Sequence, residues 1–231
     1  MRPIVKLDNV LKTYGQGEVA VRALKSVTLA LAEGAFAAVA GPSGSGKSTM
    51  LNIISGLDRP TEGEVSLDGE RLNGLSSSEL SRLRMNKVGF VFQSYNLMPV
   101  LTAYENAEYV LMLQGVKPQI RREKVMALLK QVGLGGLEHR FPRQLSGGQQ
   151  QRVAIVRAIV AEPKLVLADE PTANVDSATG AALLDLMTEL NDEKKLTFLF
   201  STHDPSVIKR AKQLIILKDG DIAYNGKPED S

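Results

Sequence analysis

Apolar residues in the first third of the chain occur in short runs interrupted by Gly, Asp and Pro, which is typical of β-strands joined by turns. Runs rich in Val, Leu and Ala predict strands over residues 4–10, 21–31, 35–40 and 63–67. A further apolar run predicts a strand over 88–92 that ends at Gln93. A Gly/Ser-rich loop after residue 40 leads into a predicted helix over 47–56. This part of the chain therefore has mostly β character.

The spacing of the apolar positions becomes helical after Thr102. Thr102 and Glu105 have the spacing of a helix capping box, and a helical apolar stripe follows at Val125, Leu128, Leu129 and Val132. Helices and strands then alternate: helix 147–161, strand 165–168, helix 177–190, strand 196–201, a helix that begins at Asp204-Pro205, strand 213–217 and a hairpin near 219–220. We therefore predict a single domain, with an α/β core over 1–93 and 161–231 and an inserted helical lobe at about 94–160.

Composition narrows the classes of protein to which the chain can belong. With 231 residues, of which 43% are apolar, the chain can form one well-buried core. The net charge is only +2 and basic residues have acidic neighbours, which disfavours a nucleic-acid-binding face. The absence of cysteine excludes disulfides and thiolate metal sites and fits a reducing compartment. We expect no signal peptide and no direct membrane insertion, because no apolar run approaches the ~20 residues that cross a bilayer.

A glycine-rich stretch between the predicted strand 35–40 and helix 47–56 has the pattern G-x-x-x-x-G-K-[ST] of a phosphate-binding loop, or P-loop. Its glycines let consecutive backbone N–H groups point toward a phosphate, and the dipole of the following helix adds to the attraction. Lys47 is expected to reach the β- and γ-phosphates, and Ser48 to ligate Mg²⁺. The stretch comprises Gly41, Pro42, Ser43, Gly44, Ser45, Gly46, Lys47, Ser48 and Thr49.

Two carboxylates, Asp169 and Glu170, follow the buried strand predicted over 165–168. Ligands of open α/β sheets bind at the carboxyl ends of the strands. We expect Asp169 to hold Mg²⁺ through its hydration shell, and Glu170, which points differently, to polarise the attacking water as general base. An Asp-Glu pair at a strand end is ordinarily part of a solvated loop, and the P-loop elsewhere in the chain is what favours the catalytic interpretation.

A second candidate anion site begins at Ser146. Ser146 and Gln149 have the spacing of a capping box, and Gly147 and Gly148 leave the N–H groups at the helix start uncovered. One P-loop does not need a second anion site in the same subunit, so the economical interpretation is that this helix start serves the nucleotide of another subunit. An ordinary capped helix is the alternative.

The P-loop, the signature sequence Leu-Ser-Gly-Gly-Gln at 145–149 and the strand ending in Asp-Glu, in this order, resemble the ABC-type ATPases over nearly the whole chain. The resemblance implies a P-loop NTPase core with a mixed, largely parallel sheet, an N-terminal antiparallel β subdomain and an inserted α-helical signature lobe. It also implies a head-to-tail dimer of two copies, in which each ATP is held between one P-loop and the partner's signature.

Four further residues take roles from the same resemblance. Gln93 matches the glutamine that contacts Mg²⁺ and water and senses the membrane subunit, and His203 matches the histidine that contacts the γ-phosphate. Tyr14 matches an aromatic residue that stacks on adenine. Asp176 matches the aspartate of a loop that crosses the dimer interface, although the loop at 173–176 departs from the usual pattern at its first and third positions.

The stretches at 14–17, 56–63 and 90–106 are most similar in pattern to the bacterial lipoprotein-release, macrolide-export and cell-division ATPases. This implies an ATPase that uses ATP and Mg²⁺ and drives a separate transmembrane permease from the cytoplasmic face of the cell membrane, with the permease contact near 93–99. A regulatory or mechanical ATPase that transports nothing is an alternative. A soluble ABC protein of DNA repair or translation is disfavoured by the single cassette and the lack of cysteine. Guanine recognition is disfavoured because Gly89 breaks the Asn-Lys-x-Asp pattern.

Overall fold

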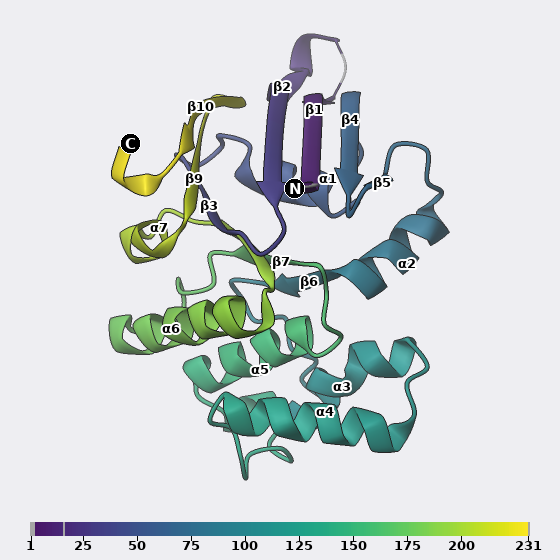
Figure 1. The fold of residues 1–231 in the computed structure, drawn as a ribbon, viewed down its shortest axis with the longest axis vertical. Coiled ribbons are helices and arrows are strands. Elements are labelled where there is room, and N and C mark those ends of the chain that lie inside the picture. Colours follow the sequence, from purple (N-terminus) through teal and green to yellow (C-terminus); the bar gives the residue numbers. More distant parts are fainter. Residues whose placement is uncertain (1–2, 16, 231) are drawn as a thin grey trace.

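The computed structural model describes residues 3–15 and 17–230, and it stacks an antiparallel sheet, a mixed sheet and a group of helices in that order (Figure 1). The antiparallel sheet has the strand order β2-β1-β4-β5. Its strands are β1 (Pro3–Tyr14), β2 (Val21–Ala32), β4 (Glu62–Leu67) and β5 (Glu70–Arg71), with a short 3-10 turn, η1 (Gly17–Val19), between β1 and β2. The early predicted strands are thus confirmed.

The mixed sheet has the strand order β10-β9-β3-β8-β7-β6. It consists of β3 (Phe36–Ala40), β6 (Val88–Val91), β7 (Leu165–Asp169), β8 (Thr197–Ser201), β9 (Gln213–Lys218) and β10 (Asp221–Gly226). All of its neighbouring strands pair in parallel except β9 and β10, which form the predicted hairpin. Asp219 and Gly220 turn this hairpin with φ of 50° and 85°, as a tight two-residue turn requires. The predicted fold class, a largely parallel α/β sheet preceded by an antiparallel sheet, is confirmed.

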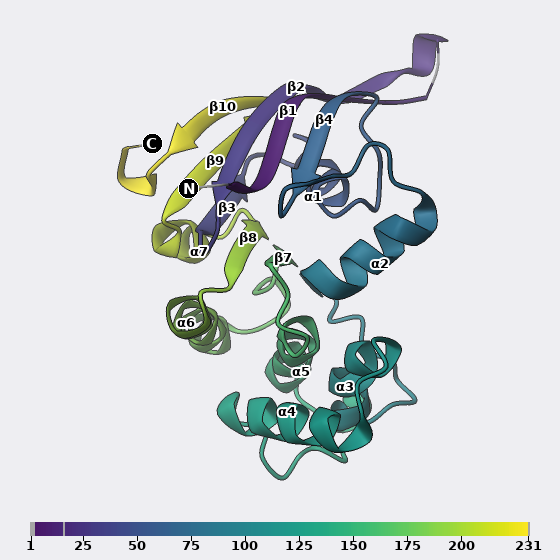
Figure 2. The ribbon, with the colours of Figure 1, turned by 45° about the vertical axis from the view of Figure 1, so that its right-hand side comes forward.

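Seven α-helices of the described residues surround the mixed sheet (Figure 2). They are α1 (Lys47–Ile54), α2 (Ser77–Lys87), α3 (Ala103–Leu113), α4 (Pro118–Gln131), α5 (Gly147–Ile159), α6 (Ser177–Lys194) and α7 (Pro205–Arg210), and the remaining 3-10 turns are η2 (Pro142–Gln144) and η3 (Pro228–Asp230). None of these helices is long and apolar enough to cross a membrane. Helices α3, α4 and α5 lie together, away from the antiparallel sheet (Figures 1 and 2).

The central strands are apolar along their whole length because both faces of the mixed sheet are covered. In β7, Leu165 and Leu167 pack into a core shared with α1 and the antiparallel sheet. Val166 and Ala168 point to the opposite face and pack into a second core, shared with α3 to α7. Strands β3, β8 and β9 alternate in the same way. The sheet therefore separates two hydrophobic cores and presents its strand ends between them.

Several predicted helix starts are confirmed, but one helix was not predicted. Thr102 and Glu105 form the capping box of α3, and Asp204 caps α7. Helix α2 was missed because its sequence is largely polar. Only Leu80 and Leu83 of this helix are buried, which is too few apolar positions to give a helical pattern. The predicted division into an α/β core and a helical lobe at about 94–160 stays a prediction.

Three predicted helix ends were displaced, and one of these helices, predicted over 147–161, ends at Ile159. The helix predicted over 47–56 ends at Ile54, because Gly56 adopts φ of 68° and turns the chain out of the helix. The helix predicted over 177–190 continues to Lys194 and ends where Lys195 enters the left-handed region at φ of 54°. None of these shifts moves a candidate site residue.

Candidate functional site

The candidate residues follow four neighbouring parallel strands at the same edge of the sheet. The P-loop follows β3, His203 follows β8, Asp169 ends β7 and Gln93 follows β6. Since β3, β8, β7 and β6 are consecutive neighbours in the sheet and parallel, their carboxyl ends lie side by side. The fold therefore gathers these loops where α/β sheets bind their ligands.

Two glycines of the P-loop are required by close backbone approaches. Gly41 has φ of +146°, and a Cβ at this position would lie 2.1 Å from the carbonyl oxygen of Leu217. Gly46 has φ of +103°, and its Cβ would lie 2.4 Å from the carbonyl oxygen of Ala23. Gly46 is also the N-cap of α1 and supplies no side-chain cap, so the first N–H groups of that helix remain available to an anion.

The Lys47 ammonium lies over the P-loop. Its Nζ donates to the carbonyl oxygens of Gly41, at 2.7 Å, and of Pro42, at 2.9 Å. Ser48 lies exposed in the first turn of α1. The loop thus presents an ammonium, a hydroxyl and a helix N-terminus together, which is the donor set that a polyphosphate requires.

Glu170 adopts a left-handed backbone conformation beside the end of β8. Its φ is 45°, a region that costs a non-glycine residue about 1 to 2 kcal/mol. Its carboxylate lies 2.6 Å from Nδ1 of His203 and accepts a hydrogen bond from Thr202 at 3.2 Å. The Glu170 side chain is only 16% exposed, whereas that of His203 is 77% exposed. An ionised carboxylate only accepts hydrogen bonds, so an Nδ1–H of His203 would be the donor in this contact.

Asp169 supplies a carboxylate at the end of β7, opposite Ser201 in the register with β8. Among the described residues, no hydrogen bond to its carboxylate is found, so both oxygens can take a ligand. Residues 3–15 and 17–230, which the structure describes, contain no group of three or more His, Asp or Glu side chains that could hold a metal ion. A carboxylate with both oxygens free matches the way Mg²⁺ is usually held, by one or two protein oxygens together with substrate phosphates and water.

The loop after β6 is tied to two other segments. Gln93 is exposed, and its backbone oxygen accepts from the Asn174 side chain at 3.0 Å. The Tyr95 hydroxyl donates to the backbone oxygen of Asn174 at 2.9 Å. Arg157 of α5 donates to the backbone oxygens of Tyr95 and Asn96 at 2.8 and 2.6 Å, and burial lowers the pKa of its guanidinium. Sequence reasoning missed these ties, because their partners are far apart along the chain.

The signature forms the predicted capped helix start. Ser146 accepts from the backbone N–H of Gln149 at 3.3 Å, and Gln149 accepts from that of Ser146 at 2.9 Å. A Cβ on Gly147 would lie 2.8 Å from the hydroxyl oxygen of Tyr95, and one on Gly148 would lie 2.3 Å from Cγ2 of Thr179. No hydrogen bond within the described residues joins the signature to the P-loop.

Tyr14 lies at the end of β1, and Thr49 of the P-loop stretch acts to lower the pKa of its hydroxyl. That hydroxyl also donates to Asp58 at 2.6 Å, and burial together with this bond raises the pKa of Tyr14. Lys12 lies 2.6 Å from Asp58 and 4.7 Å from the centre of the Tyr14 ring. Tyr14 is 42% exposed, and its contacts with Asp58 and Lys12 fix the orientation of its ring.

Asp176 is the N-cap of α6 in this structure. One carboxylate oxygen accepts from the backbone N–H of Thr179 at 3.0 Å, and the other accepts from the Thr179 hydroxyl at 2.6 Å. These bonds hold the pKa of Asp176 below its usual range. Within the subunit, Asp176 therefore fixes the start of α6, and its place at a dimer interface stays a prediction.

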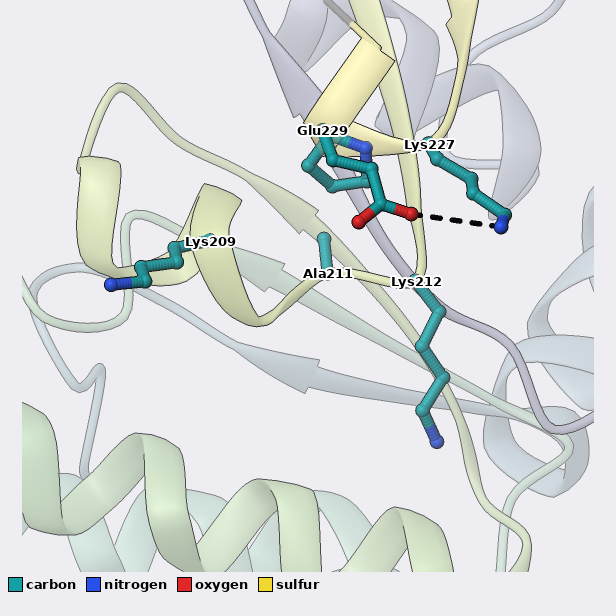
Figure 3. Close-up of a pocket in the computed structure, with 6 residues that line it drawn as sticks. Lys209, Ala211, Lys212, Lys227 and Glu229 are labelled. Atoms are coloured by element: carbon teal, nitrogen blue, oxygen red, sulfur yellow. Dashed lines mark ion pairs between the residues drawn. The ribbon is translucent and has the colours of Figure 1, made fainter.

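A cavity of about 310 Å³ lies apart from these loops, beside α7 and the C-terminal turn (Figure 3). Two of its lysines are already paired, Lys212 with Asp192 at 2.9 Å and Lys227 with Glu229 at 3.6 Å. Its lining contains none of the residues predicted to bind nucleotide: Lys209, Ala211, Lys212, Lys227, Pro228 and Glu229. The candidate site is therefore the edge of the sheet, where the loops converge.

Comparison with known proteins gives consistent matches. A family model described as ABC transporter matches residues 24–173. An uncharacterized ABC transporter ATP-binding protein of Methanocaldococcus jannaschii, MJ0796, is 48% identical over 231 residues, covering 97% of this chain and 97% of that protein. The macrolide export ATP-binding/permease protein MacB of Syntrophobacter fumaroxidans is 44% identical over 219 residues, which are 94% of this chain and 31% of that protein.

Solved structures agree with these matches. A dimeric, post-hydrolysis structure of MJ0796 bound to ADP and Pi has a TM-score of 0.89 and 47% identity, covering 97% of this chain and 98% of that chain. The cbiO1 protein of Clostridium perfringens, part of the ABC transporter complex cbiONQ, has a TM-score of 0.91 at 27% identity, covering 100% of this chain and 90% of that chain. The chain therefore belongs to the ABC transporter family, as an ATP-binding, ATP-hydrolysing cassette.

Proposed function

We propose that this chain is the ATPase subunit of an export-type transporter, dimerises on ATP and drives a separate membrane permease from the inner face of the membrane. The observation that carries the proposal is the contact between Glu170 and His203 at the carboxyl ends of β7 and β8, on the sheet edge from which the P-loop also emerges. A largely buried, fixed carboxylate beside a polyphosphate site is suited to orienting a water for attack on a terminal phosphate.

Different residues of the site bind the phosphates of ATP, hold Mg²⁺ and act on the attacking water. The P-loop backbone and Lys47 hold the phosphates, while Ser48 and Asp169 hold Mg²⁺, which would neutralise charge on the phosphate oxygens. Glu170 accepts a proton from the attacking water, and His203 contacts the γ-phosphate. The exposed and fixed ring of Tyr14 supports a stacking role on adenine.

The second half of each site comes from a second copy of the chain. The signature residues Ser146 to Gln149 bind the phosphates of the partner's ATP, and Asp176 lies at the interface between the copies. Support comes from the capped, glycine-bearing start of α5, which no hydrogen bond of the described residues joins to the P-loop of its own subunit. The dimeric form of MJ0796, at 47% identity, gives further support.

The permease contact is assigned to the loop after β6, residues 93–99. Gln93 is exposed there, and the loop is tied by Asn174 and Tyr95 to the segment that precedes Asp176. Movement imposed by a permease would therefore reach both Gln93 and the proposed dimer interface. The 44% sequence identity to the MacB protein supports a partner permease of the macrolide-export kind. It favours this function over that of a regulator that transports nothing.

A mixture of two inactive variants tests the shared site. Ser146→Arg disables the signature, Lys47→Ala disables the P-loop, and each homodimer should hydrolyse ATP very slowly. Mixing them should restore activity, because a heterodimer retains one complete site from the P-loop of the first and the signature of the second. Activity that stays at the level of the separate variants, with heterodimers demonstrated by affinity tags, would contradict the proposal.

A further inference from the structure

Gln151, in the second turn of α5, is a fully buried amide whose hydrogen bonding is one-sided. Its side chain is 0% exposed. Its Nε2 donates to the carbonyl oxygen of Pro171 at 2.6 Å, whereas its Oε1 has no hydrogen-bond partner in the part of the chain that the structure describes. Buried polar groups are nearly always paired, so a half-paired amide calls for a functional explanation. The one side-chain hydrogen bond of this amide is the one that it donates to the Pro171 carbonyl oxygen.

The carbonyl that Gln151 holds belongs to the residue directly after Glu170. Proline has no N–H, so the Glu170–Pro171 peptide offers no donor by which its surroundings can fix it. Glu170 itself stands at φ of 45°, and such a conformation persists only where neighbouring groups impose it. Its backbone N–H donates to Ser201 at 2.9 Å, and its carbonyl accepts from Ala173 at 3.2 Å. The Gln151 bond adds a restraint from helix α5, on the residue that follows Glu170.

Helix α5, which carries Gln151, also carries the signature at its first residues. Figures 1 and 2 show this helix below β7, between α3 and α6. The Gln151 side chain therefore bridges the signature helix and the loop that holds the catalytic carboxylate. No other side-chain hydrogen bond of the described residues joins α5 to the backbone of residues 169–173.

We propose that Gln151 is a positioning residue for Glu170: by holding the Pro171 carbonyl, it keeps the strained Glu170 backbone in the conformation that aims the carboxylate. The inference rests on the proposed role of Glu170 as general base. In the proposed dimer, α5 starts at the partner's ATP while Glu170 serves the subunit's own ATP. The Gln151 bond thus connects the two composite sites through one subunit.

Replacement of the amide by an apolar side chain of similar size tests the proposal. Gln151→Met removes the donor, so single-turnover hydrolysis at saturating ATP should slow about tenfold, because small displacements of a catalytic group have large effects on rate. The dissociation constant for ATP should stay within about twofold, since the P-loop is untouched. Gln114→Met is the matched control: Gln114 also donates its amide to a backbone carbonyl, that of Met85 at 3.0 Å, and should keep the wild-type rate.

A double-mutant cycle separates positioning from a general structural role. If Gln151 acts through Glu170, Gln151→Met should cause no further loss of rate in a Glu170→Gln background. An undiminished tenfold loss in that background would overturn the inference, as would a wild-type rate in the single Gln151→Met variant. Brisk turnover by Glu170→Gln alone would instead refute the proposed base, so the two failures are distinguishable.

A second variant keeps the test open if Gln151→Met does not fold. In Gln151→Glu, a protonated carboxyl can donate to the Pro171 carbonyl but an ionised one cannot. The rate of this variant relative to wild type should therefore rise as the pH is lowered, and the thermal stability of the two proteins should converge. A relative rate that does not change with pH would overturn the inference.

Discussion

The left-handed conformation of Glu170 makes a quantitative prediction about stability and function together. Glu170→Ala and Glu170→Gly both remove the carboxylate and its contacts with Thr202 and His203. They differ in the backbone, because glycine adopts φ of 45° without strain whereas alanine does not. We expect both variants to lose hydrolysis and the glycine variant to be the more stable of the two.

The magnitude follows from two opposing terms. Relief of the left-handed strain favours glycine by about 1 to 2 kcal/mol. The larger conformational entropy of glycine in the unfolded chain disfavours it by roughly 0.5 to 1 kcal/mol. The free energy of unfolding of Glu170→Gly should therefore exceed that of Glu170→Ala by about 0.5 to 1 kcal/mol, which is about 1 to 4 °C in Tm for a chain of this length.

The assay is denaturant unfolding of both variants, with Glu162 as an internal control. Glu162 also adopts a left-handed conformation, at φ of 52°, but it is exposed and lies outside the candidate site. Glu162→Gly should likewise be more stable than Glu162→Ala by about 0.5 to 1 kcal/mol, with hydrolysis unchanged in both. The reasoning is refuted if Glu170→Ala is at least as stable as Glu170→Gly while Glu162→Gly is more stable than Glu162→Ala. The backbone of Glu170 would then not be strained.

Two further predictions concern packing and charge. Gly148→Ala should destabilise the chain by about 1 to 3 kcal/mol in denaturant unfolding, because its Cβ would lie 2.3 Å from Cγ2 of Thr179. Thr179→Ser, which deletes that methyl group but keeps the hydroxyl, should restore most of the loss; no restoration would contradict the contact. Burial acts to raise the pKa of Asp58, but hydrogen bonds from Lys12 and Tyr14 outweigh it and hold the pKa below the usual 3.8. A lowered pKa stabilises the fold above about pH 4 and loses that effect as the pH falls through the folded-state pKa, so Asp58→Asn should cost about 1 kcal/mol at pH 7 and progressively less in acid. A cost that does not vary with pH would show that the charge is irrelevant.

Much of the fold could be predicted because the central strands and several helices have strong local signals. The apolar runs of β3, β7 and β8 reflect burial on both faces, and the caps of α3, α5 and α7 are short-range patterns. Helix α2 escaped prediction because its buried side consists of Leu80 and Leu83 in an otherwise polar sequence. Its capping box at Ser76 and Glu79 was the available signal.

The candidate site divides in the same way. The P-loop and the signature are contiguous in sequence, so their residues and local geometry could be read directly. The contact of Glu170 with His203 joins residues on different strands, and it depends on the register that sets Asp169 opposite Ser201. No local pattern encodes that register. Likewise, the Gln151 bond could not be foreseen, since a glutamine in a helix carries no signal of the distant carbonyl that it meets.

The alternation of the central strands between two cores has a consequence for how the sequence can vary among relatives. In β3, β9, β8 and β7, the even-numbered apolar residues face the helices and the odd-numbered ones face α1 and the antiparallel sheet. Volume changes at Val166 should thus be compensated among the helices, and changes at Leu167 around α1. Adjacent residues of one strand should accordingly belong to separate covarying groups. Even-numbered positions should covary with one another, and odd-numbered positions should form a second group.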